Sequence, residues 1–103
     1  MNAKFEMVFT KEEIERIEDK ISNNGKHEIT VDLHQLTVKE AERLVKNLIV
    51  INRDECRLNV IHGYNRGTAL KTMITTDNIS PRIRNRISCK DNPGRTILDV
   101  VAA

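Results

Sequence analysis

Residues 28–34, which read EITVDLH, decide the fold of this chain. Apolar side chains alternate with polar ones along this stretch, so that Ile29, Val31 and Leu33 share one face. Strict alternation of this kind is typical of a β-strand that buries one side and exposes the other. The stretch therefore predicts a strand with an apolar core face and a polar outer face.

The segment that follows predicts a helix and then a second strand. Thr37 and Glu40 have the spacing of a capping box, in which the two residues cap the start of a helix reciprocally. An apolar stripe at helical spacing continues to a helix end near Arg53, at Ala41, Leu44, Val45, Leu48 and Ile49. Residues 57–62 (RLNVIH) then predict a short strand. A strand, a helix and a strand with short connections predict two parallel strands.

The N-terminal part is expected to stay outside this unit. Residues 1–9 show no period and predict a tail. Thr10 and Glu13 form another capping-box pair, and apolar residues follow at helical intervals, at Ile14, Ile17 and Ile21. Asn23-Asn24-Gly25 would end that helix. We therefore divide the chain into residues 1–27, a tail and helix, and residues 28–103, the domain proper.

The C-terminal part completes the expected sheet. A loop over 63–67 leads into a helix over 68–77, and strands over 82–90 and 96–101 flank a turn at 91–94. The last two strands are expected to be antiparallel. The predicted fold class is α/β, an α+β sandwich in which a mixed four-stranded sheet (βαβαββ) carries helices.

Charge is distributed unevenly along the 103 residues. Residues 1–56 hold nine Lys/Arg and twelve Asp/Glu, whereas residues 57–103 hold eight and three. A basic half favours an anionic partner such as nucleic acid. Alternation over 82–90 also places a row of cations on one face of the expected strand. Arg84 and Arg86 belong to this row, and we expect both to contact an anionic partner.

Cysteine usage and hydropathy limit the class of protein. Cys56 and Cys89 are the two cysteines and lack CxxC spacing, which argues against a disulfide scaffold and a cysteine-based zinc site. No apolar run approaches the roughly 20 residues of a membrane helix. The N-terminus lacks the pattern of a signal peptide. We expect a cytoplasmic protein with no membrane partner.

Two histidines fall where a site is expected. His34 ends the first core strand and His62 the second, and ligands of open α/β sheets bind beyond the carboxyl ends of parallel strands. Asp32 lies two residues before His34, so both side chains leave the same strand face. The loop from Gly63 to Gly67 and the following helix offer backbone N–H groups to an anion. The sequence predicts one shared site for these groups.

Three segments resemble the Smr (small MutS-related) domain family. Residues 31–41 (VDLHQLTVKEA) are similar to its LDLHG-LTxxEA motif, and residues 60–71 (VIHGYNRGTALK) to its strand that ends in HGxG before a helix. Residues 92–98 (NPGRTIL) resemble its closing turn and final strand. The resemblance implies a stand-alone Smr domain with the fold of the C-terminal domain of bacterial translation initiation factor three. Gln35 stands where that family usually has glycine, and the second loop is longer than usual.

The resemblance also implies chemistry, because Smr domains nick DNA or cleave RNA, including messages on stalled ribosomes. Matching the motifs assigns catalysis to Asp32, His34 and His62. The residues expected to contact nucleic acid are Gly63, Tyr64, Arg66, Gly67, Lys71, Arg84 and Arg86. A magnesium ion bridging Asp32 and a substrate phosphate is compatible with this set, so metal dependence is left open.

The leading hypothesis is thus an endonuclease that hydrolyses phosphodiester bonds in DNA or RNA. A non-catalytic module that binds nucleic acid or the ribosome is the alternative. A protein-interaction module with structural histidines is a third. Binding to nucleic acid weakens steeply as the salt concentration rises. A salt titration would therefore distinguish the endonuclease and the nucleic-acid-binding module from the protein-interaction module.

Overall fold

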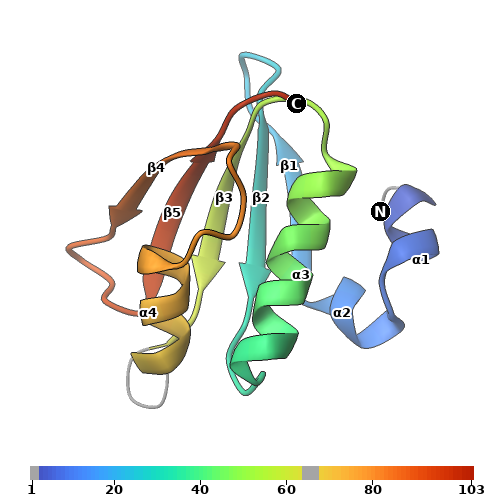
Figure 1. The fold of residues 1–103 in the computed structure, drawn as a ribbon. Coiled ribbons are helices and arrows are strands. Elements are labelled where there is room, and N and C mark those ends of the chain that lie inside the picture. Colours follow the sequence, from blue (N-terminus) through green and yellow to red (C-terminus); the bar gives the residue numbers. More distant parts are fainter. Residues whose placement is uncertain (1–2, 64–67) are drawn as a thin grey trace.

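The computed structural model describes residues 3–63 and 68–103, which form helices packed on one mixed β-sheet (Figure 1). The helices are α1 (Ala3–Val8), α2 (Lys11–Glu15), α3 (Val38–Ile51) and α4 (Thr68–Thr76). The strands are β1 (Ile17–Ile21), β2 (His27–Asp32), β3 (Cys56–Ile61), β4 (Ile83–Ser88) and β5 (Arg95–Val100). They lie in the order β1-β2-β3-β5-β4.

The central prediction of the fold is confirmed. β2 and β3 are parallel and are connected by α3, and β5 is antiparallel to both β3 and β4. The capping box of α3 is present: Glu40 N donates to Thr37 Oγ1 at 3.1 Å, and Thr37 N donates to Glu40 Oε1 at 2.9 Å. The mixed α+β class is therefore correct.

The prediction of a helix that runs through Ile21 is wrong. The capping box at Thr10 starts only α2, and Ile17–Ile21 is a strand that pairs antiparallel with β2. Spacing of isoleucines by three and four residues is compatible with a helix, but the outer edge of β2 needs a backbone partner, and β1 supplies it. Asn23-Asn24-Gly25 is the turn of this hairpin, with Gly25 at φ 80°.

The sheet therefore has five strands in the described residues instead of the predicted four. The division at residue 27 is also wrong, because β1 belongs to the sheet and His27 already lies in β2. The expected tail contains α1, whose Phe5 packs edge-on against Phe9 with ring centroids 5.6 Å apart. Both rings are buried in the core.

A β-bulge between Ile83 and Asn85 overturns the expected row of cations on β4. The extra residue shifts the alternation, so that Arg86 pairs with the buried Leu98 on the helix side of the sheet. Arg86 Nη1 donates to Ile74 O in the last turn of α4 at 3.1 Å. Arg84 stays exposed, so the two arginines do not act as one row.

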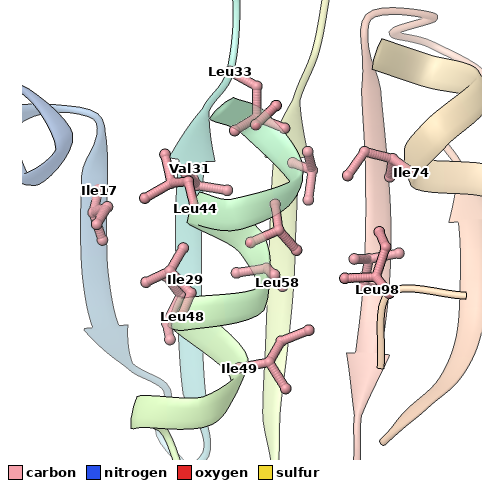
Figure 2. Close-up of a cluster of buried hydrophobic side chains, with 14 of the residues drawn as sticks. Ile17, Ile29, Val31, Leu33, Leu44, Leu48, Ile49, Leu58, Ile74 and Leu98 are labelled. Carbon is pink, nitrogen blue, oxygen red and sulfur yellow. The ribbon is translucent and has the colours of Figure 1, made fainter. Parts of the chain in front are cut away.

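The hydrophobic core lies between the sheet and the layer formed by α3 and α4 (Figure 2). Side chains of β2 and β3 meet the apolar stripe of α3, and Leu98 and Ile74 extend the core toward α4. Side chains that share the core face of β2 are Ile29 and Val31, each 0% exposed. No helix in the described part of the chain is long and apolar enough to cross a lipid bilayer.

The opposite face of the sheet carries polar and half-buried side chains, because α3 and α4 lie on the same side (Figure 1). We call it the open face. Its exposed or half-buried members are Glu18, Lys20, Glu28, Thr30, Asp32, Arg57, Ile61, Ile87, Arg95, Ile97 and Asp99. The alternation of each strand thus separates an apolar core face from a face that solvent reaches.

Candidate active site at the carboxyl edge of the sheet

Asp32 and His34 form a hydrogen-bonded pair at the carboxyl end of β2. Asp32 Oδ1 accepts from the backbone N of His34 at 3.0 Å and lies 2.5 Å from its Nδ1. Because a carboxylate only accepts, we assign the Nδ1 proton to this bond. The Nε2 atom is then the nitrogen that can exchange a proton. The His34 side chain is 55% exposed, so a ligand can reach it.

Arg16 fixes the backbone that carries this pair. Its Nη1 donates to Asp32 O at 3.0 Å and to His34 O at 2.9 Å. Arg16 O in turn accepts from Asp32 N at 2.9 Å. The residue follows α2, so the N-terminal segment holds the Asp32–His34 pair in place and sets a positive charge beside it.

The turn after the pair contains a strained residue. Leu36 N donates to Leu33 O at 3.1 Å, and Gln35 between them has φ 69°. This left-handed conformation disfavours side chains with a Cβ. The glycine usual at this position in Smr domains would adopt it without strain.

We expect Gln35→Gly to increase the free energy of unfolding by about 0.5–1 kcal/mol, because the strain removed exceeds the added flexibility of the unfolded chain. Urea denaturation of wild type and variant measures the difference. Gln35→Ala keeps the Cβ and is expected to give no increase. A glycine variant less stable than wild type would contradict the strain argument.

His62 lies at the same edge but inside the fold. Its side chain is 0% exposed, Nδ1 lies 2.6 Å from Gly63 O, and Nε2 lies 2.9 Å from Thr96 Oγ1. Since a carbonyl only accepts, Nδ1 donates, and the neutral ring accepts the Thr96 hydroxyl proton at Nε2. Both nitrogens are thereby satisfied, and neither is available to a substrate.

The structure thus confirms that Asp32, His34 and His62 lie at the same edge of the sheet. It does not bring His62 into one accessible site with the other two. β2 and β3 are parallel, with Asp32 opposite Ile61, so His34 and His62 both follow the carboxyl ends of neighbouring strands. Asp32 projects from the open face, whereas His62 continues the buried alternation of β3. His62 therefore presents no ring nitrogen to a substrate at this edge, and its observed contacts are all within the fold.

The segments that resemble the second and third Smr motifs contact each other through glycines. His62 N and Gly63 N both donate to Gly94 O, at 2.9 and 3.0 Å. A Cβ added to Gly94 would lie 3.2 Å from Gly63 Cα, and Gly63 has φ 74°. The close approach therefore depends on the absence of a side chain at Gly94, and the left-handed backbone at Gly63 separately favours glycine there.

The predicted nucleic-acid contacts are only partly within the described structure. Tyr64, Arg66 and Gly67 lie outside the described residues. Lys71, in the first turns of α4, is half-buried and near His62, whose pKa its charge helps to lower. Lys71 therefore lies on the helix side of the sheet, away from the open face that carries Asp32.

Burial lowers the pKa of His62, with Lys71 adding to the effect and the bond to Gly63 O opposing it. A depressed pKa means that the unfolded state binds the proton first as pH falls below about 6.5. The stability contribution is therefore complete above that pH and is lost on acidification. We expect the urea midpoint to fall between pH 7.5 and 5.

The His62 imidazole NMR signals provide the check on this prediction. They should stay at their neutral positions to a lower pH than those of a free histidine. A His62 that titrates at or above the value of a free histidine would contradict the burial argument.

Neither a metal-ligand cluster in the described residues nor a known relative supports the candidate site. Among residues 3–63 and 68–103, no group of three or more His, Cys, Asp or Glu side chains is arranged to hold a metal ion. No protein-family model matches this sequence, and no curated protein matches it. The candidate site therefore rests on its own geometry.

The sequence reasoning missed Arg16, Thr96 and Arg95. Arg16 was missed because the sequence predicted a helix over this segment, which gave no reason to place Arg16 beside Asp32 and His34. Arg95 and Thr96 lie on opposite faces of β5, which the alternation of residues 95–100 indicates in retrospect, since Thr96, Leu98 and Val100 are all buried.

Proposed function

We propose that this protein is an endonuclease of the Smr type that cleaves phosphodiester bonds in DNA or RNA. The observation that carries the proposal is the exposed His34 whose Nδ1 is bound by Asp32 Oδ1 at 2.5 Å. A histidine held in one tautomer by a carboxylate is suited to proton transfer near neutral pH. Its place beyond a parallel strand is where open α/β sheets bind ligands.

In this reaction His34 Nε2 takes the proton of the attacking hydroxyl, which belongs to water or to a ribose 2′-OH. The oxygen forms a bond to phosphorus as the bond to the leaving oxygen breaks, and the leaving oxygen takes a proton from solvent water. Asp32 stabilises the imidazolium formed at His34. Arg16, fixed beside the pair, offsets negative charge that develops on the phosphoryl oxygens.

The three motif-like segments support the same proposal from the sequence. The ends of the segments 31–41, 60–63 and 92–98 meet at one edge of the sheet, which is the edge that carries the Asp32–His34 pair. We extend the proposal to a fold like that of the C-terminal domain of translation initiation factor three. The ribosome and its messages are then candidate partners.

The test is incubation of the purified chain with labelled supercoiled plasmid and labelled structured RNA, each with Mg²⁺ and with EDTA. Cleavage that is lost in His34→Ala supports the endonuclease and shows its substrate and metal dependence. Binding without cleavage under every condition would favour the non-catalytic module. Absence of both binding and cleavage would contradict a role in nucleic-acid metabolism.

A further inference from the structure

The end of the open face nearest His34 carries a row of side chains from three strands and from the residue that precedes β1. Strand register places Asp32 of β2 opposite Ile61 of β3, and Ile61 opposite Arg95 of β5. On the other side, Arg16 precedes β1 and binds the backbone of Asp32. We call Arg16, Asp32, Ile61 and Arg95 the carboxyl-edge row.

Cations in this row differ from those elsewhere on the open face. Arg57 Nε lies 3.1 Å from Asp99 Oδ1, and Lys20 Nζ lies 3.1 Å from Glu18 Oε1, so these charges are compensated locally. Within the described ranges, Arg16 and Arg95 form no ion pair. Arg95 Nε donates to Cys89 Sγ at 3.5 Å, and the charges of Asp91 and Glu28 act on Arg95 from a greater distance than an ion pair. The guanidinium groups of Arg16 and Arg95 can therefore still pair with an anionic ligand on the two sides of the Asp32–His34 pair.

Apolar side chains adjoin the row. Ile61 lies within it, and Ile97 and Ile87 pair with each other on β5 and β4. Ile61 and Ile97 are half-buried, and Ile87 is 44% exposed. Isoleucine side chains offer apolar contact to the exposed bases and sugars of an unpaired strand, without the aromatic stacking that single-strand sites commonly use. A duplex keeps the faces of its bases stacked inside the helix.

We propose that a single strand of nucleic acid crosses the open face along the carboxyl-edge row, at right angles to the β-strands. This inference rests on the proposed function. The scissile phosphate lies at His34, and a neighbouring phosphate lies at Arg95. β2 and β5 are separated by one strand, so their backbones are about 10 Å apart. The contact of Arg95 Nε with Cys89 Sγ lies on the β4 side of β5. Bases and sugars lie over Ile61 and Ile97, which predicts binding without sequence preference.

The test measures binding of a fluorescent single-stranded oligonucleotide that resists cleavage, as a function of salt. Arg95→Gln is expected to weaken binding and to reduce the salt slope by about 0.7, the loss of one phosphate contact. Arg95→Lys should keep the slope. The matched control is Arg57→Gln, on the same face but paired with Asp99, which should bind as wild type does.

A second variant keeps the proposal testable if the Arg95→Gln protein does not fold. Ile61→Lys adds a charge within the row and is expected to tighten binding and steepen the salt slope. Equal effects at Arg95 and Arg57, or no effect at Arg95 and Ile61 while wild type binds, would overturn the path along this row and leave the proposed function standing. Failure of wild type to bind any oligonucleotide would overturn both.

Discussion

Replacing His34 with alanine is expected to slow phosphodiester cleavage about 10²–10⁴-fold, the usual cost of removing a positioned acid–base group. Affinity for substrate should change far less, because cations elsewhere on the surface supply the electrostatic attraction. The fold should persist, since the side chain is exposed and lies outside the core. Single-turnover cleavage rates and binding isotherms measure the two effects separately.

His27 provides the matched control. It lies at the other end of β2, and its Nδ1 is 3.2 Å from Asp19 Oδ1, so it is also a histidine paired with an aspartate. His27→Ala is expected to leave the cleavage rate of the folded protein unchanged. If His34→Ala cleaves as fast as wild type, the acid–base role of His34 is wrong.

Replacing Arg82 with methionine is expected to lower the free energy of unfolding by about 3 kcal/mol. Arg82 Nη1 donates to Ile49 O at 2.5 Å, and Nη2 donates to Asn52 O at 2.7 Å, which satisfies carbonyls at the end of α3. Its Nε donates to Val101 O at 2.8 Å and so holds the chain after β5. Methionine fills similar space but leaves these acceptors without a donor.

Arg84→Met is the control for Arg82, because Arg84 is exposed at the β-bulge two residues away. It is expected to change stability by less than about 0.5 kcal/mol. Arg82→Lys should recover only part of the loss, since one ammonium cannot reach three separate carbonyls. Urea denaturation gives all three values, and a stable Arg82→Met variant would show that water satisfies those carbonyls instead.

The parallel unit of the fold was predictable because its signals are local and agree with one another. Alternation over 28–34, the capping box at Thr37 and the branched residues over 57–62 each indicate one structure. The N-terminal segment was not predictable in the same way. Ile17 and Ile21 fit a helix or a strand, and only the unpaired edge of β2, which is a tertiary feature, decides between them.

The candidate site was predictable in part for a related reason. The two-residue spacing of Asp32 and His34 and the parallel strands correctly indicated their pairing and their edge. His62 shares the core face of β3 with Leu58 and Val60, but the neighbouring Ile61 is also apolar, so the alternation of this short strand did not mark His62 as buried. The β-bulge that separates Arg84 from Arg86 is likewise set by pairing with β5 and leaves no local signal.

The central claim is that Asp32 acts through His34 to cleave phosphodiester bonds. A double-mutant cycle of single-turnover cleavage rates, with Asp32→Asn, His34→Gln and the combined variant, tests it most directly. The account predicts that the combined variant is no slower than His34→Gln alone, because Asp32 has no partner to orient once the imidazole is gone. Rate losses that multiply in the combined variant would contradict it, since Asp32 and His34 would then act independently.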